Sequence, residues 1–216
     1  MKEVFLIRSP DEIVLFLQLL TGCDKLKGDE HAMRIVALSK LAYLAKERGE
    51  LEAALQYERE AYTFCLQLSD TFEGAGFLSL VAAKLYNMGQ LYYKMGKSEK
   101  AKSCFEQARE FDAKAGNFVG QAADIRSLGF LQQDAGNLQG ALELHKEALR
   151  LDYKAGFEYG VAVDQANIGV VYLELHDFQQ ALQYFAQALA SFQACGQVQE
   201  AEKVRQLMQT AESGLT

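Results

Sequence analysis

The segments FDAKAG (residues 111–116) and LDYKAG (residues 151–156) are nearly identical and begin 40 residues apart. The same step leads back to TFEGAG, which ends at Gly76, and forward to SFQACG, which ends at Gly196. Glycine is favoured just past the end of a helix, where the chain needs a left-handed turn. This period therefore predicts a chain built from repeated helical units.

A second glycine series lies between the first, at Gly49, Gly96 and Gly136, with His176 in the fourth place. An alanine follows each of these positions four or five residues later. Each unit therefore contains two helices joined by a tight turn. The step from Gly49 to Gly96 is 47 residues rather than 40, so we expect the first unit to carry a longer second helix or a longer loop at residues 69–76.

Small residues recur at fixed places in both helices of each unit. Midway along the first helix they are Ala42, Gly89, Gly129 and Gly169. The second helix carries small–large–small triplets, which are Ala54, Glu58, Ala61; Ala101, Phe105, Ala108; Ala141, His145, Ala148; and Ala181, Phe185, Ala188. Small side chains let two antiparallel helices approach closely, and large ones fill the remaining space.

This pattern recurs four times in phase and resembles the tetratricopeptide repeat family. The family's usual period is about 34 residues. The longer period is similar to that of the subclass found in kinesin light chains, spindle-orienting adaptors and bacterial peptide-sensing regulators. The chain departs from the family pattern in lacking tryptophan and the closing proline, and in placing Glu58 and His145 at large apolar positions.

The resemblance implies an all-α fold, a right-handed α-solenoid of about four helix–turn–helix repeats. The repeats are expected at residues 28–76, 77–116, 117–156 and 157–196. Residues 1–27 are expected to hold an N-terminal capping helix and a linker. Residues 197–216 are expected to form a C-terminal capping helix and tail, because apolar residues recur at helical spacing between Val198 and Ala211.

Charge and composition exclude several classes of protein. The net charge is −7 and the sequence has no basic run, which argues against a nucleic-acid partner. No apolar stretch of the sequence is long enough to span a bilayer. The cysteines lie far apart within helical patterns, so we expect reduced thiols and a cytoplasmic protein. They are Cys23, Cys65, Cys104 and Cys195.

The stretch SPDEIVLFLQLLTGC at residues 9–23 allows two interpretations. Its last four residues resemble a bacterial lipobox, which would attach Cys23 to lipid and place the protein in the bacterial envelope. However, two acids directly precede the apolar run, which is poor for translocation. The serine, the proline and the same two acids instead favour the start of a helix that ends at Gly22. We favour this helix, packed against the first repeat.

The sequence holds no recognisable catalytic constellation. The segment at residues 96–98 resembles the end of a phosphate-binding loop, but the earlier glycine is replaced by Leu91. The histidines His31, His145 and His176 lie in different units, and no acid or cysteine keeps metal-like spacing with them. We therefore expect a protein that is not an enzyme and has no cofactor, no metal and no small-molecule substrate.

The resemblance further implies that the first helices line a concave groove and the second helices form the convex face. Groove residues are those that lie off the packing stripe of each first helix. The candidate peptide-binding residues are Lys40, Tyr43, Tyr86, Asn87, Gln90, Tyr93, Arg126, Ser127, Phe130, Asn167, Val170 and Leu173.

Asparagines share one register of this predicted groove, at Asn87 and Asn167. An asparagine amide both donates and accepts, so it can pair with the main chain of an extended peptide. In the long-repeat relatives, asparagines at this register hold peptide main chain. The aromatic and apolar candidates are suited to anchoring side chains. The basic candidates Lys40 and Arg126 favour an acidic residue of the ligand.

The leading hypothesis is therefore a non-enzymatic interaction module that binds an extended peptide or partner segment in its groove. One alternative is a self-assembling scaffold, a homo-oligomer that uses the apolar N-terminal helix or the convex face. Another is a membrane-tethered lipoprotein assembly factor, which requires lipid on Cys23.

Overall fold

The structure is a computed structural model that describes residues 30–68 and 74–215. Nine helices and no strand lie within these residues, which confirms the all-α fold class. None of the described helices is long and apolar enough to cross a bilayer. The predicted N-terminal capping helix and Cys23 lie outside the described residues.

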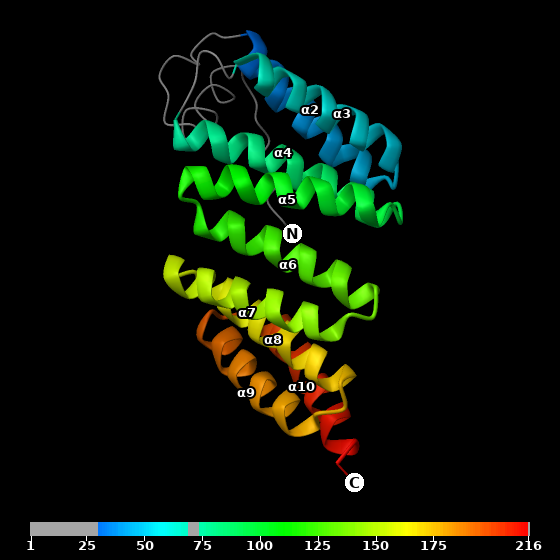
Figure 1. Cartoon of the computed structure of the whole chain (residues 1–216), viewed down its shortest axis with the longest axis vertical. Coiled ribbons are helices and arrows are strands. Elements are labelled where there is room, and N and C mark those ends of the chain that lie inside the picture. Colours follow the sequence, from blue (N-terminus) through cyan, green and yellow to red (C-terminus); the bar gives the residue numbers. More distant parts are fainter. Residues whose placement is uncertain (1–29, 69–73, 216) are drawn as a thin grey trace. The chain divides into compact units, whose positions relative to one another are not determined.

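The helices follow one another in antiparallel pairs (Figure 1). They are α2 (Glu30–Glu47), α3 (Leu51–Leu68), α4 (Ala75–Lys94), α5 (Ser98–Ala115), α6 (Phe118–Asp134), α7 (Leu138–Ala155), α8 (Glu158–Glu174), α9 (Phe178–Ala194) and α10 (Val198–Ser213). Within the pairs, α2 packs on α3, α4 on α5, α6 on α7 and α8 on α9. Helices α2–α5 belong to a first compact unit and α6–α10 to a second.

A residue with left-handed backbone ends the first helix of each pair. Three of these residues are the predicted glycines Gly49, Gly96 and Gly136. The fourth is His176, whose φ of 59° makes it the only non-glycine residue of the described chain with positive φ. The following residue, Asp177, donates its backbone N–H to the carbonyl of Tyr172 at 2.9 Å. This bond satisfies a carbonyl that the helix end would otherwise leave without a donor.

The other glycine series behaves as predicted at three of its four positions. Positive φ occurs at Gly116, Gly156 and Gly196, each at the end of a second helix. Gly76 differs, because it lies inside the first turn of α4. Helix α3 has 18 residues, as do α5 and α7, so the extra length of the first unit does not extend α3. Part of it lies between Leu68 and the start of α4, and part lengthens α4, which has 20 residues where α6 and α8 have 17.

Close packing within the helix pairs explains the small residues of the first helices. A Cβ atom added to Gly89 would lie 2.6 Å from the ring of Phe105. A Cβ added to Gly169 would likewise lie 2.6 Å from the ring of Phe185. Both distances are shorter than any van der Waals contact, so these rings occupy the space that a larger residue would need.

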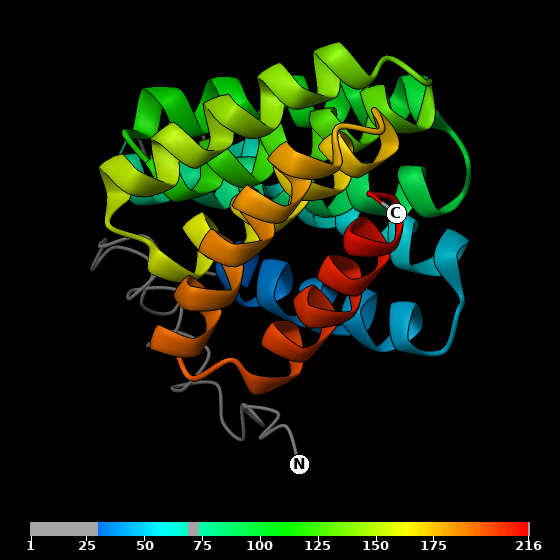
Figure 2. The same ribbon diagram turned by 90° about the horizontal axis from the view of Figure 1, so that it is seen from below.

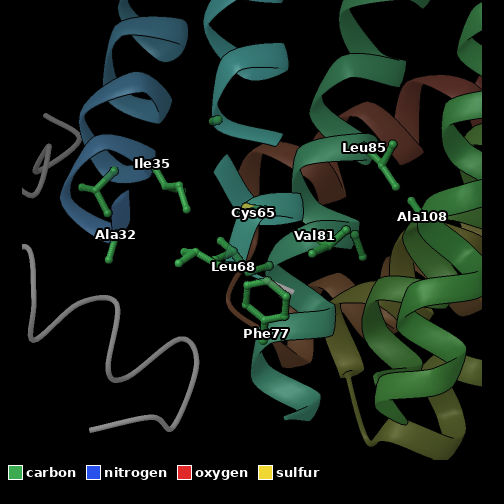
Figure 3. Packing of buried hydrophobic residues seen from close by; sticks show 12 residues of the cluster. Ala32, Ile35, Cys65, Leu68, Phe77, Val81, Leu85 and Ala108 are labelled. Atoms are coloured by element: carbon green, nitrogen blue, oxygen red, sulfur yellow. The ribbon is translucent and has the colours of Figure 1, made fainter. Parts of the chain in front are cut away.

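The first unit has a continuous apolar core that joins α2, α3, α4 and α5. Figure 3 shows the ring of Phe77 beside Leu68 and Val81, with Cys65 close to them. Burial raises the pKa of the Cys65 thiol to about 12 and also raises that of Cys104. The reactive form of cysteine is the thiolate, so these two buried, free thiols are chemically inert.

The second unit has an apolar cluster at its C-terminal end. Helix α10 lies alongside α9 (Figure 2). Its residues Ala201, Val204 and Ala211 are buried together with Phe185 and Phe192 of α9. The outer face of α10 is polar, so this helix covers an apolar surface of α9 as the sequence predicts for a C-terminal cap.

Candidate functional site

The predicted binding residues lie on the first helix of each pair, in α2 and α4 of the first unit and α6 and α8 of the second. Tyr43 is exposed, Ser127 is buried, and the remaining candidates are half-buried. Half-buried side chains on a helix are held by neighbouring helices while part of their surface stays accessible.

In the first unit, Asn87 is bound to a buried acid of the preceding helix pair. Its Nδ2 donates to Oε1 of Glu58 at 2.9 Å. The other carboxylate oxygen of Glu58 lies 3.3 Å from Nζ of Lys84. The same ammonium group donates to Oγ of Ser39 at 2.6 Å. Glu58 is only 4% exposed and Lys84 only 5%, and they form a polar cluster with the half-buried side chains of Ser39 and Asn87.

This polar cluster explains why an acid occupies a large apolar position of the repeat. Burial raises the pKa of Glu58, and the charge of Lys84 and the amide of Asn87 counteract that rise. Removing one partner of a buried ion pair typically costs about 3–5 kcal/mol, because the other charge is left unpaired. The bond to Glu58 also fixes the orientation of the Asn87 amide.

Two other candidates of the first unit contact each other. Gln90 donates from Nε2 to the hydroxyl of Tyr86 at 3.1 Å. The Tyr86 ring packs at 5.7 Å from the ring of Phe105. On α2, Tyr43 is 47% exposed, and the neighbouring Leu44 is 41% exposed. The first unit therefore presents aromatic and aliphatic side chains on the same helices as its polar candidates.

In the second unit, Arg126 is bound to two buried aspartates. Its Nε donates to Oδ1 of Asp164 at 2.6 Å, and its Nη2 donates to Oδ2 of Asp152 at 2.6 Å. Nη2 also donates to Oδ2 of Asp164 at 3.2 Å. Both aspartates are fully buried. An acidic residue of a ligand would have to compete with these two carboxylates for the guanidinium group.

One guanidinium charge cannot fully compensate two buried carboxylates. Burial raises the pKa of Asp152 to about 7, with Arg126 opposing this rise and Asp164 adding to it. Burial also raises the pKa of Asp164, again against the effect of Arg126. The arrangement therefore holds a proton more firmly than an isolated carboxylate would.

On α6, Ser127 is buried and Phe130 is half-buried. Ser127 donates from Oγ to the carbonyl of Ala123 at 3.0 Å. Phe130 packs edge-on against the ring of His145, with centroids 5.2 Å apart. His145 is fully buried, and neither of its ring nitrogens has a hydrogen-bond partner among the described residues. Burial lowers its pKa to about 4, so the ring is neutral near pH 7.

The candidates on α8 combine an amide with apolar neighbours. Asn167 is half-buried, and its Nδ2 atom is buried without a hydrogen-bond partner among the described residues. Val170 and Leu173 are half-buried and pack against the apolar cluster at the C-terminal end of the unit. Part of each side chain remains accessible beside Asn167.

The buried aspartates are functional candidates that sequence reasoning missed. Asp152 belongs to the repeated segment LDYKAG, and its counterpart Asp112 in FDAKAG is also buried. Asp112 accepts a hydrogen bond from Nδ2 of Asn117 at 2.8 Å, and burial raises its pKa to about 6. The signal was therefore present, as an acid at the same place in two nearly identical helix ends.

The helix pairs match a known repeat family. A model of the tetratricopeptide repeat matches residues 80–154 and 121–194. These overlapping matches run from α4 to α9 and cover more than half of the chain. The chain belongs to the tetratricopeptide repeat family.

Solved structures of other proteins share this fold at low sequence identity. BtubC (BKLC) from P. vanneervenii is 20% identical, with 95% of this chain and 89% of that chain covered and a TM-score of 0.66. A putative kinesin light chain of P. anserina with nearly identical repeats is 17% identical, with 85% and 97% covered and a TM-score of 0.57.

A third similar structure is the Rap conjugation gene regulator of the plasmid pLS20, solved in complex with the Phr* peptide. It is 17% identical, with 83% of this chain covered and a TM-score of 0.62. The chain spans 53% of that protein's length. No curated protein matches the sequence of this tetratricopeptide repeat chain.

Proposed function

We propose that the protein is a non-enzymatic interaction module that binds an extended peptide or partner segment along the accessible faces of its first helices. The observation that carries this proposal is the amide of Asn167, whose Nδ2 is buried without a partner. A buried donor without a partner costs about 1–3 kcal/mol. A main-chain carbonyl of a bound peptide would satisfy this donor, and Val170 would supply apolar contact beside it.

Asn87 would bind main chain in the same register of the first unit. An asparagine amide has two N–H donors and two acceptor positions, and its bond to Glu58 uses one of them. That bond also holds the amide in one orientation, which lowers the entropy cost of binding. Because Arg126 is already bound to two aspartates, Lys40 is the better of the two predicted cations for an acidic ligand residue.

Aromatic and apolar candidates would anchor the ligand's side chains. In the first unit these are Tyr86 and Tyr93, and in the second unit Phe130 and Leu173. Interfaces of this kind typically draw most of their affinity from a few such anchors. The pLS20 regulator supports the proposal because it holds a peptide and has a similar fold.

A peptide-display selection against the full chain tests this proposal. Peptides that share a motif should be enriched, and they should bind the Asn167→Ala variant at least about tenfold more weakly, since one buried amide bond is lost. The matched control is Gln187→Ala, an exposed amide on the second helix α9, which should bind like the unchanged protein. Enriched peptides that bind both variants equally well would contradict the role of Asn167.

A second candidate function is self-assembly, which the exposed leucines of α2 favour. Leu41 is 43% exposed and Leu44 is 41% exposed, on the same helix as the exposed Tyr43. Exposed apolar surface of this kind is typical of protein interfaces. Light scattering would give a mass above that of one chain, and the double variant Leu41→Ser, Leu44→Ser would lower it. A monomer at high concentration in both cases would exclude this function.

A further inference from the structure

A pocket of about 440 Å³ lies at the turn between α7 and α8. It is lined by Asp152, Tyr153, Gly156, Glu158, Val161, Ser191 and Ala194. These residues come from the end of α7, the start of α8 and the end of α9, so the whole pocket belongs to the second unit.

Asp152 is one of the lining residues, and its carboxyl group is fully buried. One of its oxygens, Oδ2, accepts a hydrogen bond from Arg126 at 2.6 Å. The other oxygen, Oδ1, is buried and has no hydrogen-bond partner among the described residues. Such a buried acceptor is costly unless a ligand or water supplies a donor. Gly160 makes the arrangement possible, since a Cβ atom there would collide with this carboxyl group.

The walls of the pocket are held in place by a buried amide. Gln165 is 4% exposed and bridges two of the lining residues. Its Nε2 donates to the hydroxyl of Tyr153 at 3.2 Å, and its Oε1 accepts from the hydroxyl of Ser191 at 2.9 Å. These bonds tie α7 to α9 across α8. The pocket is therefore a built feature rather than a gap between loose side chains.

Charge and shape together select a long cationic ligand. The lining contains two carboxyl groups, Asp152 and Glu158, and no basic residue. The nearby guanidinium of Arg126 is shared between Asp152 and Asp164, so the region stays negative when its acids are ionised. Apolar lining from Val161 adds a surface suited to the aliphatic part of a long side chain.

We propose that this pocket binds an arginine side chain of a partner protein. The planar guanidinium group would donate to the unpartnered Oδ1 of Asp152 and to the carboxylate of Glu158. The stem of the arginine would lie against Val161 and Ala194. Arginine fits better than lysine, because its group is more weakly hydrated, presents a rigid fork of donors and stacks on aromatic rings such as that of Tyr153.

The surface around the pocket suits a protein partner rather than a free amine. Phe157 and Tyr159 flank Glu158 in the sequence and are 37% and 39% exposed. Their rings lie 6.1 Å apart, and Tyr159 in turn contacts Phe192 at 6.0 Å. Aromatic residues held in this way are typical of interface centres. A partner chain that inserts an arginine would cover these rings as well.

The test is a titration of the full chain with the capped tripeptide acetyl-Ala-Arg-Ala-amide, followed by NMR at pH 7.5. That pH lies above the raised pKa of Asp152, which is about 7. We expect saturable shifts of the Ser191 and Ala194 amides. The same tripeptide with citrulline, which has the shape of arginine without its charge, should bind at least about tenfold more weakly.

Single substitutions distinguish binding in the pocket from binding to acidic residues elsewhere on the surface. Glu158→Gln, at an exposed position, and Asp152→Asn should each weaken binding of the arginine peptide about tenfold. Glu143→Gln, an exposed acid on α7 outside this pocket, should leave binding unchanged. Equal binding of the arginine and citrulline peptides, or unchanged affinity in Glu158→Gln, would overturn the proposal.

Two further outcomes would also overturn it. Shifts centred on Asn167 and Val170 would mean that the arginine peptide binds the first helices, which is the proposed peptide surface. Spermidine binding to the pocket as tightly as the tripeptide would mean that any polyamine suffices and that no arginine is recognised. Loss of the Asn167-dependent binding leaves this proposal intact, since no residue that lines the pocket is among the predicted peptide-binding residues.

Discussion

At the scale of single residues, the carboxyl group of Asp152 links the stability of the protein to pH. Burial raises its pKa from the usual 3.8 to about 7, where Asp164 adds to the effect and Arg126 opposes it. The folded protein therefore binds this proton more tightly than the unfolded chain does. The stability that the proton contributes is present at low pH and is lost as the pH rises from about 4 to about 7.

Asp152→Asn should remove this loss of stability. The amide cannot ionise, and its N–H can donate to Asp164 as the protonated acid would. The variant should match the unchanged protein near pH 4 and exceed its free energy of unfolding by about 1–3 kcal/mol at pH 8. Urea unfolding between pH 4 and pH 8 measures the difference. Glu143→Gln on the same helix is the control, and a constant difference across this range for Asp152→Asn would contradict the account.

His145 should make an opposite contribution to the pH dependence. Burial lowers its pKa from 6.5 to about 4, and the charge of Arg126 adds to this effect. Because the unfolded chain binds the proton more readily, stability is lost as the pH falls from about 6.5 to about 4. Phenylalanine occupies the same position of the repeat at Phe105 and Phe185 and packs there on a glycine.

His145→Phe should therefore stabilise the protein. It removes two buried nitrogens that lack partners, for a gain of about 1–2 kcal/mol at pH 7 and more at pH 5. Urea unfolding at both pH values measures the gain. A loss of stability at pH 7 would mean that a ring nitrogen makes a hydrogen bond that phenylalanine cannot replace.

At the scale of helices and turns, His176 offers a direct test of backbone strain. Its φ of 59° is the left-handed conformation that costs a residue with a side chain about 1–2 kcal/mol. His176→Gly should raise the free energy of unfolding by about 1 kcal/mol. The substitution also removes the edge-on contact between the His176 and Phe178 rings, which reduces this gain. Thermal unfolding followed by circular dichroism measures the change.

The reciprocal substitution is the matched control for His176. Gly136 stands at the same turn of the preceding helix pair with φ of 77°, and an added Cβ there would meet nothing within 4 Å. Gly136→His should therefore destabilise the protein by a similar amount through the backbone alone. If both substitutions change stability in the same direction, the positive φ is not the cause.

The helix ends could be predicted from the sequence because glycine reports directly on backbone conformation. Gly76 shows the limit of this reasoning, since a glycine with the right spacing lies inside the first turn of α4. The partners of charged residues could not be predicted, because they depend on packing between helices. Glu58 departs from the repeat pattern, yet it pairs with Lys84. The sequence predicts that Arg126 contacts a ligand, whereas in the structure it is bound to two buried aspartates.

At the scale of the whole molecule, each compact unit has its own apolar clusters. In repeat proteins a unit contacts only its neighbours, so the last helix must cover an apolar surface that would otherwise be exposed. Here α10 has this role in the second unit, because its buried face packs on Phe185 and Phe192 of α9. Stability of this end should therefore depend on a few buried residues of α10.

A pair of identical substitutions on α10 tests this dependence. Val204 is 2% exposed within the cluster, whereas Val198 on the same helix is 76% exposed. Val204→Ser removes apolar contacts and buries a hydroxyl, so it should cost about 2–4 kcal/mol and lower the melting temperature by several degrees. Val198→Ser should change the free energy of unfolding by less than about 0.5 kcal/mol. Equal effects of the two substitutions would mean that α10 is not held against α9 in solution, and the apolar surface of α9 would then need another cover.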